Sequence, residues 1–167
     1  EYHIAAKSYG EYLKRFPHDR KLYELTFFYA ECLYYSMQYL PAAENYRWVR
    51  DSGIDTKFRE TSALSTVLAY ENQLKLEEAK GDRKPLEVMT STQRPKELKV
   101  APRDLDPLHK NLVDASDVYM QRVPSGESIP TILYKSGEFY YAYDHFDEAR
   151  TRFWQVIDKF PDKEVVE

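Results

Sequence analysis

The chain has 167 residues, a hydrophobic content of 43% and a formal net charge of −4. It is long and apolar enough for one domain with a buried core, and its acidic balance without a Lys/Arg run disfavours nucleic acid as the main ligand. No apolar run approaches the roughly 18 residues that a membrane span needs. The single cysteine, Cys32, excludes an intrachain disulfide and is expected to be a small buried residue rather than a reactive thiol.

Apolar residues recur at steps of three and four along most of the chain, which predicts amphipathic helices. Glycine is scarce, and the alternation of β-branched residues that indicates strands is absent. We therefore expect an all-α chain of about seven helices. Their predicted ranges are 2–16, 20–37, 39–51, 56–80, 106–123, 130–144 and 146–160.

Several helix ends are marked by residues with special backbone preferences. Pro17 and Pro161 stop the helices before them, because the residue that precedes a proline is pushed out of the α region. Gly53 can take the left-handed cap conformation, and Thr56 is a candidate N-cap for the long helix that follows. The charged tail of that helix, Glu71 to Lys80, is expected to project into solvent.

Two segments far apart in the chain carry the same pattern at one constant offset. The corresponding pairs are Tyr39 and Phe146, Ala42 and Ala149, Tyr46 and Phe153, and Val49 and Val156. The preceding helices match at the same offset, with Ala30 opposite Gly137. Because Gly137 and Ala149 are small, we expect their two helices to approach closely there.

Partial copies also occur in 2–16 and in 106–123, the second at an offset of about 34 residues. This is the period of the tetratricopeptide repeat (TPR), a two-helix unit that stacks into a solenoid. The residues that resemble the TPR motif are Gly137, Ala149, Phe153 and Pro161 in one copy, and Ala30, Ala42 and Tyr46 in another.

The resemblance implies a right-handed α-solenoid of antiparallel helix pairs, forming one domain over residues 1–167. Its units are a half repeat at 2–16 and repeats at 20–51, 56–123 and 130–160. The chain begins on a second helix and ends where a new first helix is due. We therefore expect further repeats of the same chain beyond both ends.

Residues 81–105 break the pattern, with Gly81 and three prolines among charged residues and few apolar ones. Loops of this length are uncommon inside compact domains. We expect a long loop inserted in the middle repeat, a plain flexible one in preference to a segment that folds on binding. Arg122 stands where Val156 stands in the last repeat, so the middle repeat is expected to form the weakest seam.

In the TPR family the first helix of each repeat lines the concave face. Carried over residue by residue, that face has Glu24, Phe27, Glu31, Tyr34 and Tyr35 from one copy, and Thr131, Tyr134, Glu138, Tyr141 and Ala142 from the other. The aromatic–glutamate–aromatic trios within these sets share one helix face, because their members are three or four residues apart. Such a ribbon suits an extended or helical peptide with basic residues. The alternative is that the aromatics pack into the neighbouring repeat and the glutamates are solvated.

No pattern in the chain indicates catalysis. G-x-S-x-G, a phosphate loop, G-x-G-x-x-G and C-x-x-C are absent, and no histidine has a partner at metal-ligand spacing. His109 near Asp106 and Asp114 fits an exposed helix start better than a metal or acid–base site. We expect a protein that is not an enzyme and that uses no cofactor and no metal.

Two phrases narrow the resemblance: KRFP at 14–17 and DKFPD at 158–162. They are similar to TPR proteins of the Gram-negative cell envelope, including the outer-membrane-protein assembly lipoprotein, the periplasmic coordinator of the Tol–Pal system and the large multi-repeat proteins of gliding bacteria. This implies the periplasm or the outer-membrane surface as the location, with the cytoplasm as the alternative.

Taken together, these features predict a scaffold or adaptor in a multiprotein envelope assembly, which holds a partner segment on its concave face. One alternative is a structural spacer within a longer repeat protein. Another is a regulatory TPR domain attached to an enzyme elsewhere in the full-length chain.

Overall fold

The computed structural model describes residues 1–88 and 100–161, and within them the protein is all-α, with seven helices and no strand. The helices are α1 (Tyr2–Arg15), α2 (Leu22–Tyr35), α3 (Tyr39–Asp51), α4 (Arg59–Lys80), α5 (Pro107–Arg122), α6 (Ile129–Ala142) and α7 (Phe146–Lys159). All seven predicted helices are present, with ends that differ by at most three residues from those expected. None of the described helices is both long and apolar enough to cross a bilayer.

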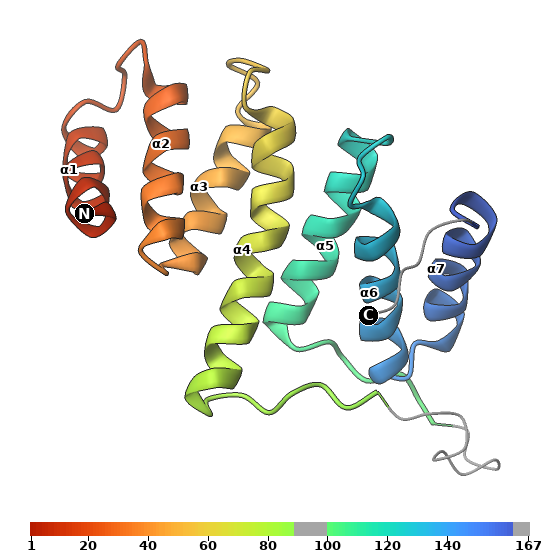
Figure 1. The fold of residues 1–167 in the computed structure, drawn as a ribbon. Coiled ribbons are helices and arrows are strands. Elements are labelled where there is room, and N and C mark those ends of the chain that lie inside the picture. Colours follow the sequence, from red (N-terminus) through yellow and green to blue (C-terminus); the bar gives the residue numbers. More distant parts are fainter. Residues whose placement is uncertain (89–99, 162–167) are drawn as a thin grey trace.

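The helices stand in a row in chain order, and consecutive helices run in opposite directions (Figure 1). Packing follows this order, because each helix makes its main contacts with the helices just before and just after it in the chain. Of these consecutive contacts the one between α5 and α6 is the smallest and the one between α3 and α4 the largest. The row therefore has its sparsest packing beside the repeat in which Arg122 replaces a valine.

Two apolar clusters fill the spaces between the helices. The first joins α1, α2 and α3 around Ala30, Ala42 and Tyr46, and it includes the buried thiol Cys32, as expected. The second runs from α3 to α6 around Val67, Tyr70, Leu112, Tyr119 and other residues. Since α3 contributes to both clusters, it links the two halves of the row.

Small residues lie where paired helices meet, as the sequence predicted. Ala30 and Ala42 are fully buried between α2 and α3, and Ala149 is buried at the matching place between α6 and α7. A Cβ atom at Gly137 would lie 2.7 Å from Cε1 of Phe153, well inside van der Waals contact. Gly137 is therefore required for the close approach of α6 to α7.

The turns that join the paired helices also repeat each other in backbone conformation. Met37 after α2 and Asp144 after α6 both have positive φ, of 59° and 68°. Each turn carries the same bond, from Gln38 N to Leu33 O and from His145 N to Tyr140 O, both 2.9 Å. The internal repeat of the sequence is therefore also a repeat of backbone geometry.

Three helices end in one common way. The residue after α1, α5 and α7 is Phe16, Val123 and Phe160, with φ of −128°, −129° and −136°. A proline follows each of them and holds it outside the α region, as predicted for Pro17 and Pro161. Gly53 likewise has the expected positive φ, of 68°.

The start and the tail of α4 differ from expectation. The helix begins at Arg59 after Phe58, so Thr56 is not its cap, and no side chain caps this end. The tail does not project freely: Leu74 is buried, and the Lys135 ammonium donates to Glu71 at 3.2 Å. The tail is held because α5 packs on α4 and Lys135 of α6 pairs with Glu71.

The described ends of the 81–105 connection are anchored rather than free. Arg83 pairs with Glu77 on α4 at 2.9 Å and with Asp106, the N-cap of α5, at 3.0 Å. These bonds fasten the start of the connection to both flanking helices. The expectation of a flexible insert is therefore wrong for this part, and residues 89–99 lie outside the described residues.

At the far end of the connection, Arg103 forms hydrogen bonds with the turn between α6 and α7. Its Nε donates to the buried carboxylate of Asp144 at 2.8 Å, its Nη2 donates to Ala142 O, and its N–H donates to Tyr143 O at 2.9 Å. The guanidinium also lies over the ring of Tyr143. The connection thus ties α4 and α5 to the last helix pair, beside the sparse contact of α5 with α6.

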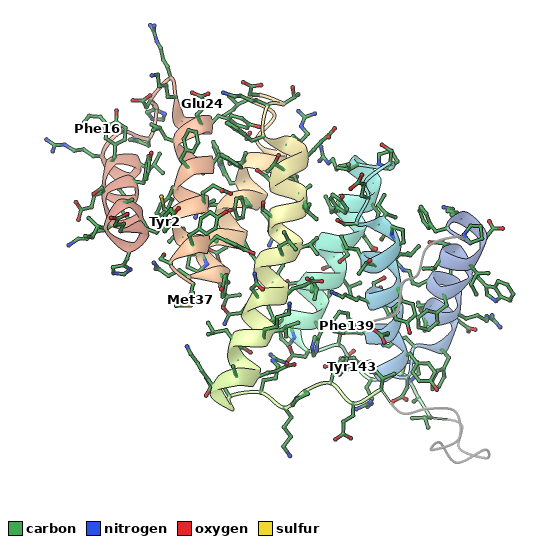
Figure 2. All side chains as sticks on the ribbon, in the orientation of Figure 1. Tyr2, Phe16, Glu24, Met37, Phe139 and Tyr143 are labelled. Atoms are coloured by element: carbon green, nitrogen blue, oxygen red, sulfur yellow. The ribbon has the colours of Figure 1, made fainter. Side chains whose placement is uncertain are left out.

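His109 is buried rather than exposed, which corrects the sequence expectation. Only 3% of it is accessible, and its Nδ1 is 2.9 Å from the hydroxyl of Tyr143. Phe139 lies in the lower half of α6, and Tyr143 follows its end (Figure 2). Their ring centroids are 4.9 Å and 5.7 Å from that of the His109 imidazole. Burial, and then the charge of Arg83, lower the pKa of His109, so the folded protein holds the imidazole neutral.

We predict that replacing Gly137 by alanine lowers the free energy of unfolding by about 1–3 kcal/mol, because the added methyl group overlaps Phe153. Gly10→Ala is the matched control, since its Cβ would meet only the end of the Tyr29 side chain, at 3.0 Å. Urea unfolding followed by circular dichroism measures both. An alanine at 137 as well tolerated as one at 10 would contradict the close contact.

We predict that stability falls between pH 7.5 and 5.5 because of His109. Its lowered pKa in the folded state means that the unfolded chain takes up a proton more readily than the folded one as the pH falls through about 6.5, and this favours unfolding. Thermal melts of the wild type, of His109→Gln and of the exposed control His18→Gln should show the loss in the first and third proteins only. An unchanged pH slope in His109→Gln would refute this origin.

Candidate protein-binding surface

The first predicted trio, on α2, lies beneath α4 and its leading turn. Phe27 is only 7% exposed, and its ring stacks on that of Phe58 with centroids 4.0 Å apart. The Tyr34 hydroxyl accepts a hydrogen bond of 2.6 Å from Asn72 Nδ2 of α4. Phe27 therefore lies in the core under Phe58, which agrees with the alternative that this aromatic packs into its neighbour and not with an open concave face.

Glu31, between these aromatics, is held by a neighbour on α3. Its carboxylate accepts a hydrogen bond of 2.5 Å from the Tyr46 hydroxyl. Burial, followed by the bond to this carboxylate, raises the pKa of Tyr46 far above its ordinary value. Glu31 is therefore a structural acceptor at the α2–α3 contact rather than a solvated charge.

The remaining predicted residues of this copy lie at the two ends of α2. Glu24 pairs with the Lys57 ammonium at 2.7 Å. Tyr35 is exposed, and its ring stacks on Tyr2 of α1 with centroids 5.0 Å apart. Figure 2 shows Glu24 at the upper end of α2, and Tyr2 and Met37 at the lower ends of α1 and α2. These contacts leave the α2 copy with little free surface.

The second predicted trio, on α6, is more open. Tyr134 packs against Phe153 at 5.4 Å and Tyr141 against Phe146 at 5.5 Å, both across to α7, and all three trio residues are half-buried. Thr131 is exposed, whereas Ala142 is buried. Among the described residues, no helix follows α7 to cover this pair as α4 covers α2 and α3.

Glu138 has no counterpart of the hydroxyl that binds Glu31. Phe153 stands at the place of Tyr46, so its ring offers no hydrogen bond. The nearby cation, Lys135, already pairs with Glu71 at 3.2 Å. Burial raises the pKa of Glu138 above its ordinary value, although the charge of Lys135 acts in the opposite direction.

The outer face of α7 carries an apolar surface that sequence reasoning missed. Trp154 is 62% exposed and Ile157 is 59% exposed. With Phe146, Phe153 and Tyr141 they line a shallow hollow of about 230 Å³, mostly apolar, which continues the α6 trio. We call these five residues together with Glu138 the α6–α7 surface.

A signal for this surface is present in the repeat itself. At the offset that relates the two copies, Trp154 replaces Arg47 and Ile157 replaces Arg50. Arg50 is 6% exposed and pairs with Asp51, whereas Ile157 is mostly exposed. Exposed positions of a helix normally carry polar residues. An exposed isoleucine at the position where the other copy has a buried arginine is therefore a signal for an apolar surface.

The described residues contain no group of three or more His, Cys, Asp and Glu side chains placed to hold a metal. The chain matches no protein-family model, and no curated protein sequence matches it either. The inference about function therefore depends on the geometry of this chain itself.

Proposed function

We propose that the protein is a TPR-type solenoid that acts as a scaffold for other proteins. Three features support a repeat of this kind: the buried small residues Ala30, Ala42 and Ala149 with Gly137 at matching places of the two helix pairs, the matching turns at Met37 and Asp144, and the matching helix ends before prolines. Helix pairs that each expose one apolar side must stack on a neighbour to bury it.

The observation that carries the binding function is the α6–α7 surface. Isolated exposed apolar residues are ordinary, but several gathered around one hollow mark an interaction site. Here Trp154, Ile157 and Phe146 line one hollow together with Tyr141, which the sequence had already named as a candidate for partner binding. Tryptophan and tyrosine at the centre of such a patch contribute most to binding energy, at about 2 kcal/mol or more each.

The setting that we propose is a multiprotein assembly of the Gram-negative cell envelope, on its periplasmic side. The support for this is the pair of phrases KRFP and DKFPD, which resemble envelope TPR proteins. In this protein both phrases terminate helices, α1 and α7, with one shared backbone geometry. The protein would then hold a partner in place rather than act on it.

The proposal is tested by capturing partners from envelope extracts of the producing cells. We expect the double variant Trp154→Ala/Ile157→Ala to lose a protein that the wild type retains, while its melting temperature stays within about 3 °C, because both side chains are mostly exposed. Ile4→Ala, which removes an equally exposed apolar side chain from α1, is the matched control and should retain the partner. Identical capture by all three proteins would contradict the proposal and would favour a structural spacer.

A further inference from the structure

A small polar cavity lies between α3 and α5, against the α4 helix that stands between them. Its volume is about 110 Å³, enough for a few water molecules or one compact ion. The residues that line it are Arg47 and Arg50 of α3, Tyr70 of α4, and Asn111, Asp114, Ala115 and Val118 of α5. These three helices are in the middle of the row (Figure 1), so the walls of the cavity do not depend on what precedes α1 or follows α7.

Tyr70 brings a hydroxyl without a protein partner to this cavity. Only 3% of the residue is exposed, and its hydroxyl forms no hydrogen bond within the described part of the chain. The polar groups of buried side chains almost always bind a protein group, an ordered water or an ion. Because Tyr70 lines the cavity, we expect the partner of its hydroxyl inside it.

Arg50 is buried beside the same cavity, with only 6% of the residue exposed. Its Nε and Nη2 donate to the carboxylate of Asp51 at 2.9 and 2.6 Å, whereas Nη1 forms no hydrogen bond with the described residues. Arg122 of α5 shares this carboxylate at 3.4 Å. The bonds from Arg50 lower the pKa of Asp51, and the charges of Arg122 and Arg47 act in the same direction. One carboxylate thus faces three guanidinium groups, so the group as a whole is cationic.

Two exposed side chains complete the set of hydrogen-bond donors around the cavity. Arg47 is one helical turn before Arg50 on the same side of α3, and it forms no ion pair within the described part of the chain. The amide of Asn111 lines the cavity from α5 and can also donate. The one carboxylate in the lining, Asp114, is paired with the Lys110 ammonium at 2.8 Å. Donors from three helices therefore meet at a site of positive charge.

A cationic cavity of this size with several donors suits one small oxyanion. Guanidinium groups bind carboxylates and phosphates through charge-assisted hydrogen bonds. A planar carboxylate is satisfied by the edge of a single guanidinium, as Asp51 is by Arg50. Donors that surround a site from three helices fit a tetrahedral group better, because its oxygens point in different directions.

We propose that the cavity between α3 and α5 binds a phosphate group, with Arg47 and Arg50 compensating its charge and Tyr70 and Asn111 donating to its remaining oxygens. The volume holds the phosphate alone, so the ligand is free phosphate or the phosphorylated end of a molecule that stays outside. Bound phosphate would join α3 to α5 across α4, as the contact of Asp51 with Arg122 does. This site goes beyond the scaffold function and does not depend on the α6–α7 surface.

The test uses inorganic phosphate, added to the whole protein in a buffer free of other oxyanions, with the ionic strength held constant by chloride. Heteronuclear NMR follows the side-chain amide of Asn111, which reports on the cavity itself. We expect a saturable shift of this signal, and a melting temperature that rises with phosphate concentration because the ligand binds the folded state. Acetate should bind about ten-fold more weakly or less, since it is planar and carries less charge.

Two variants test the proposed donors. Arg47→Gln removes an exposed charge and should weaken phosphate binding about ten-fold, because a charge-assisted hydrogen bond is lost. Tyr70→Phe keeps the ring and should weaken binding about three-fold, without lowering the melting temperature in the absence of phosphate, since the hydroxyl has no protein partner. Arg20→Gln removes an exposed arginine from the turn before α2 and is the charge-matched control, which should bind phosphate as the wild type does.

The proposal is overturned if Asn111 shows no saturable shift, if acetate binds as tightly as phosphate, or if Arg20→Gln weakens binding as much as Arg47→Gln does. Methyl phosphate then identifies the source of the ligand. If it binds as tightly as inorganic phosphate, the site accepts a phosphate group carried by a larger molecule, and if it does not bind, the site is for free phosphate. Neither result affects partner capture by the α6–α7 surface, so the scaffold function is tested separately.

Discussion

The fold depends on small residues that let paired helices approach each other closely. At Gly137 the ring of Phe153 fills the space that any side chain would need, and the same role falls to Ala30 and Ala42 in the first full pair. Phe27 and Tyr34 of the first pair contact α4 or the turn before it, whereas Tyr134 and Tyr141 of the last pair are half-buried. The properties of the α6–α7 surface therefore follow from the way its two helices pack.

The aromatic–glutamate–aromatic face has different surroundings in its two copies, on α2 and on α6. On α2 it is partly covered by α4 and by Phe58 just before that helix, and its glutamate accepts a hydrogen bond from a tyrosine hydroxyl of α3. On α6 the matching face keeps its aromatics and its glutamate, but the hydroxyl is gone and the flanking arginines have become tryptophan and isoleucine. A copy that serves internal packing and a copy that can serve binding thus differ at only a few positions. This contrast is the strongest reason to regard the α6–α7 surface as a site.

The sequence predicted what is local and missed what is distant. Helix positions, proline stops and the small residues at the helix pairs follow from spacing within about 35 residues, and the structure has all of them. The covering of Phe27 by Phe58, the clasp of Arg103 on Asp144 and the burial of His109 were not foreseen. The local sequence does not show which distant turn a given arginine or aromatic residue will contact. Trp154 and Ile157 were overlooked because the apolar stripe of α7 was already complete without them.

The central claim is that the apolar face of α7 is covered in the working assembly and open in the isolated protein. Oxidative footprinting read by mass spectrometry tests this directly, since the chain has two tryptophans, Trp48 and Trp154, and both are exposed. The account predicts that Trp154 is oxidised readily in the purified protein and is protected in the native assembly, while labelling of Trp48 stays the same. Equal labelling of Trp154 in both states would contradict it.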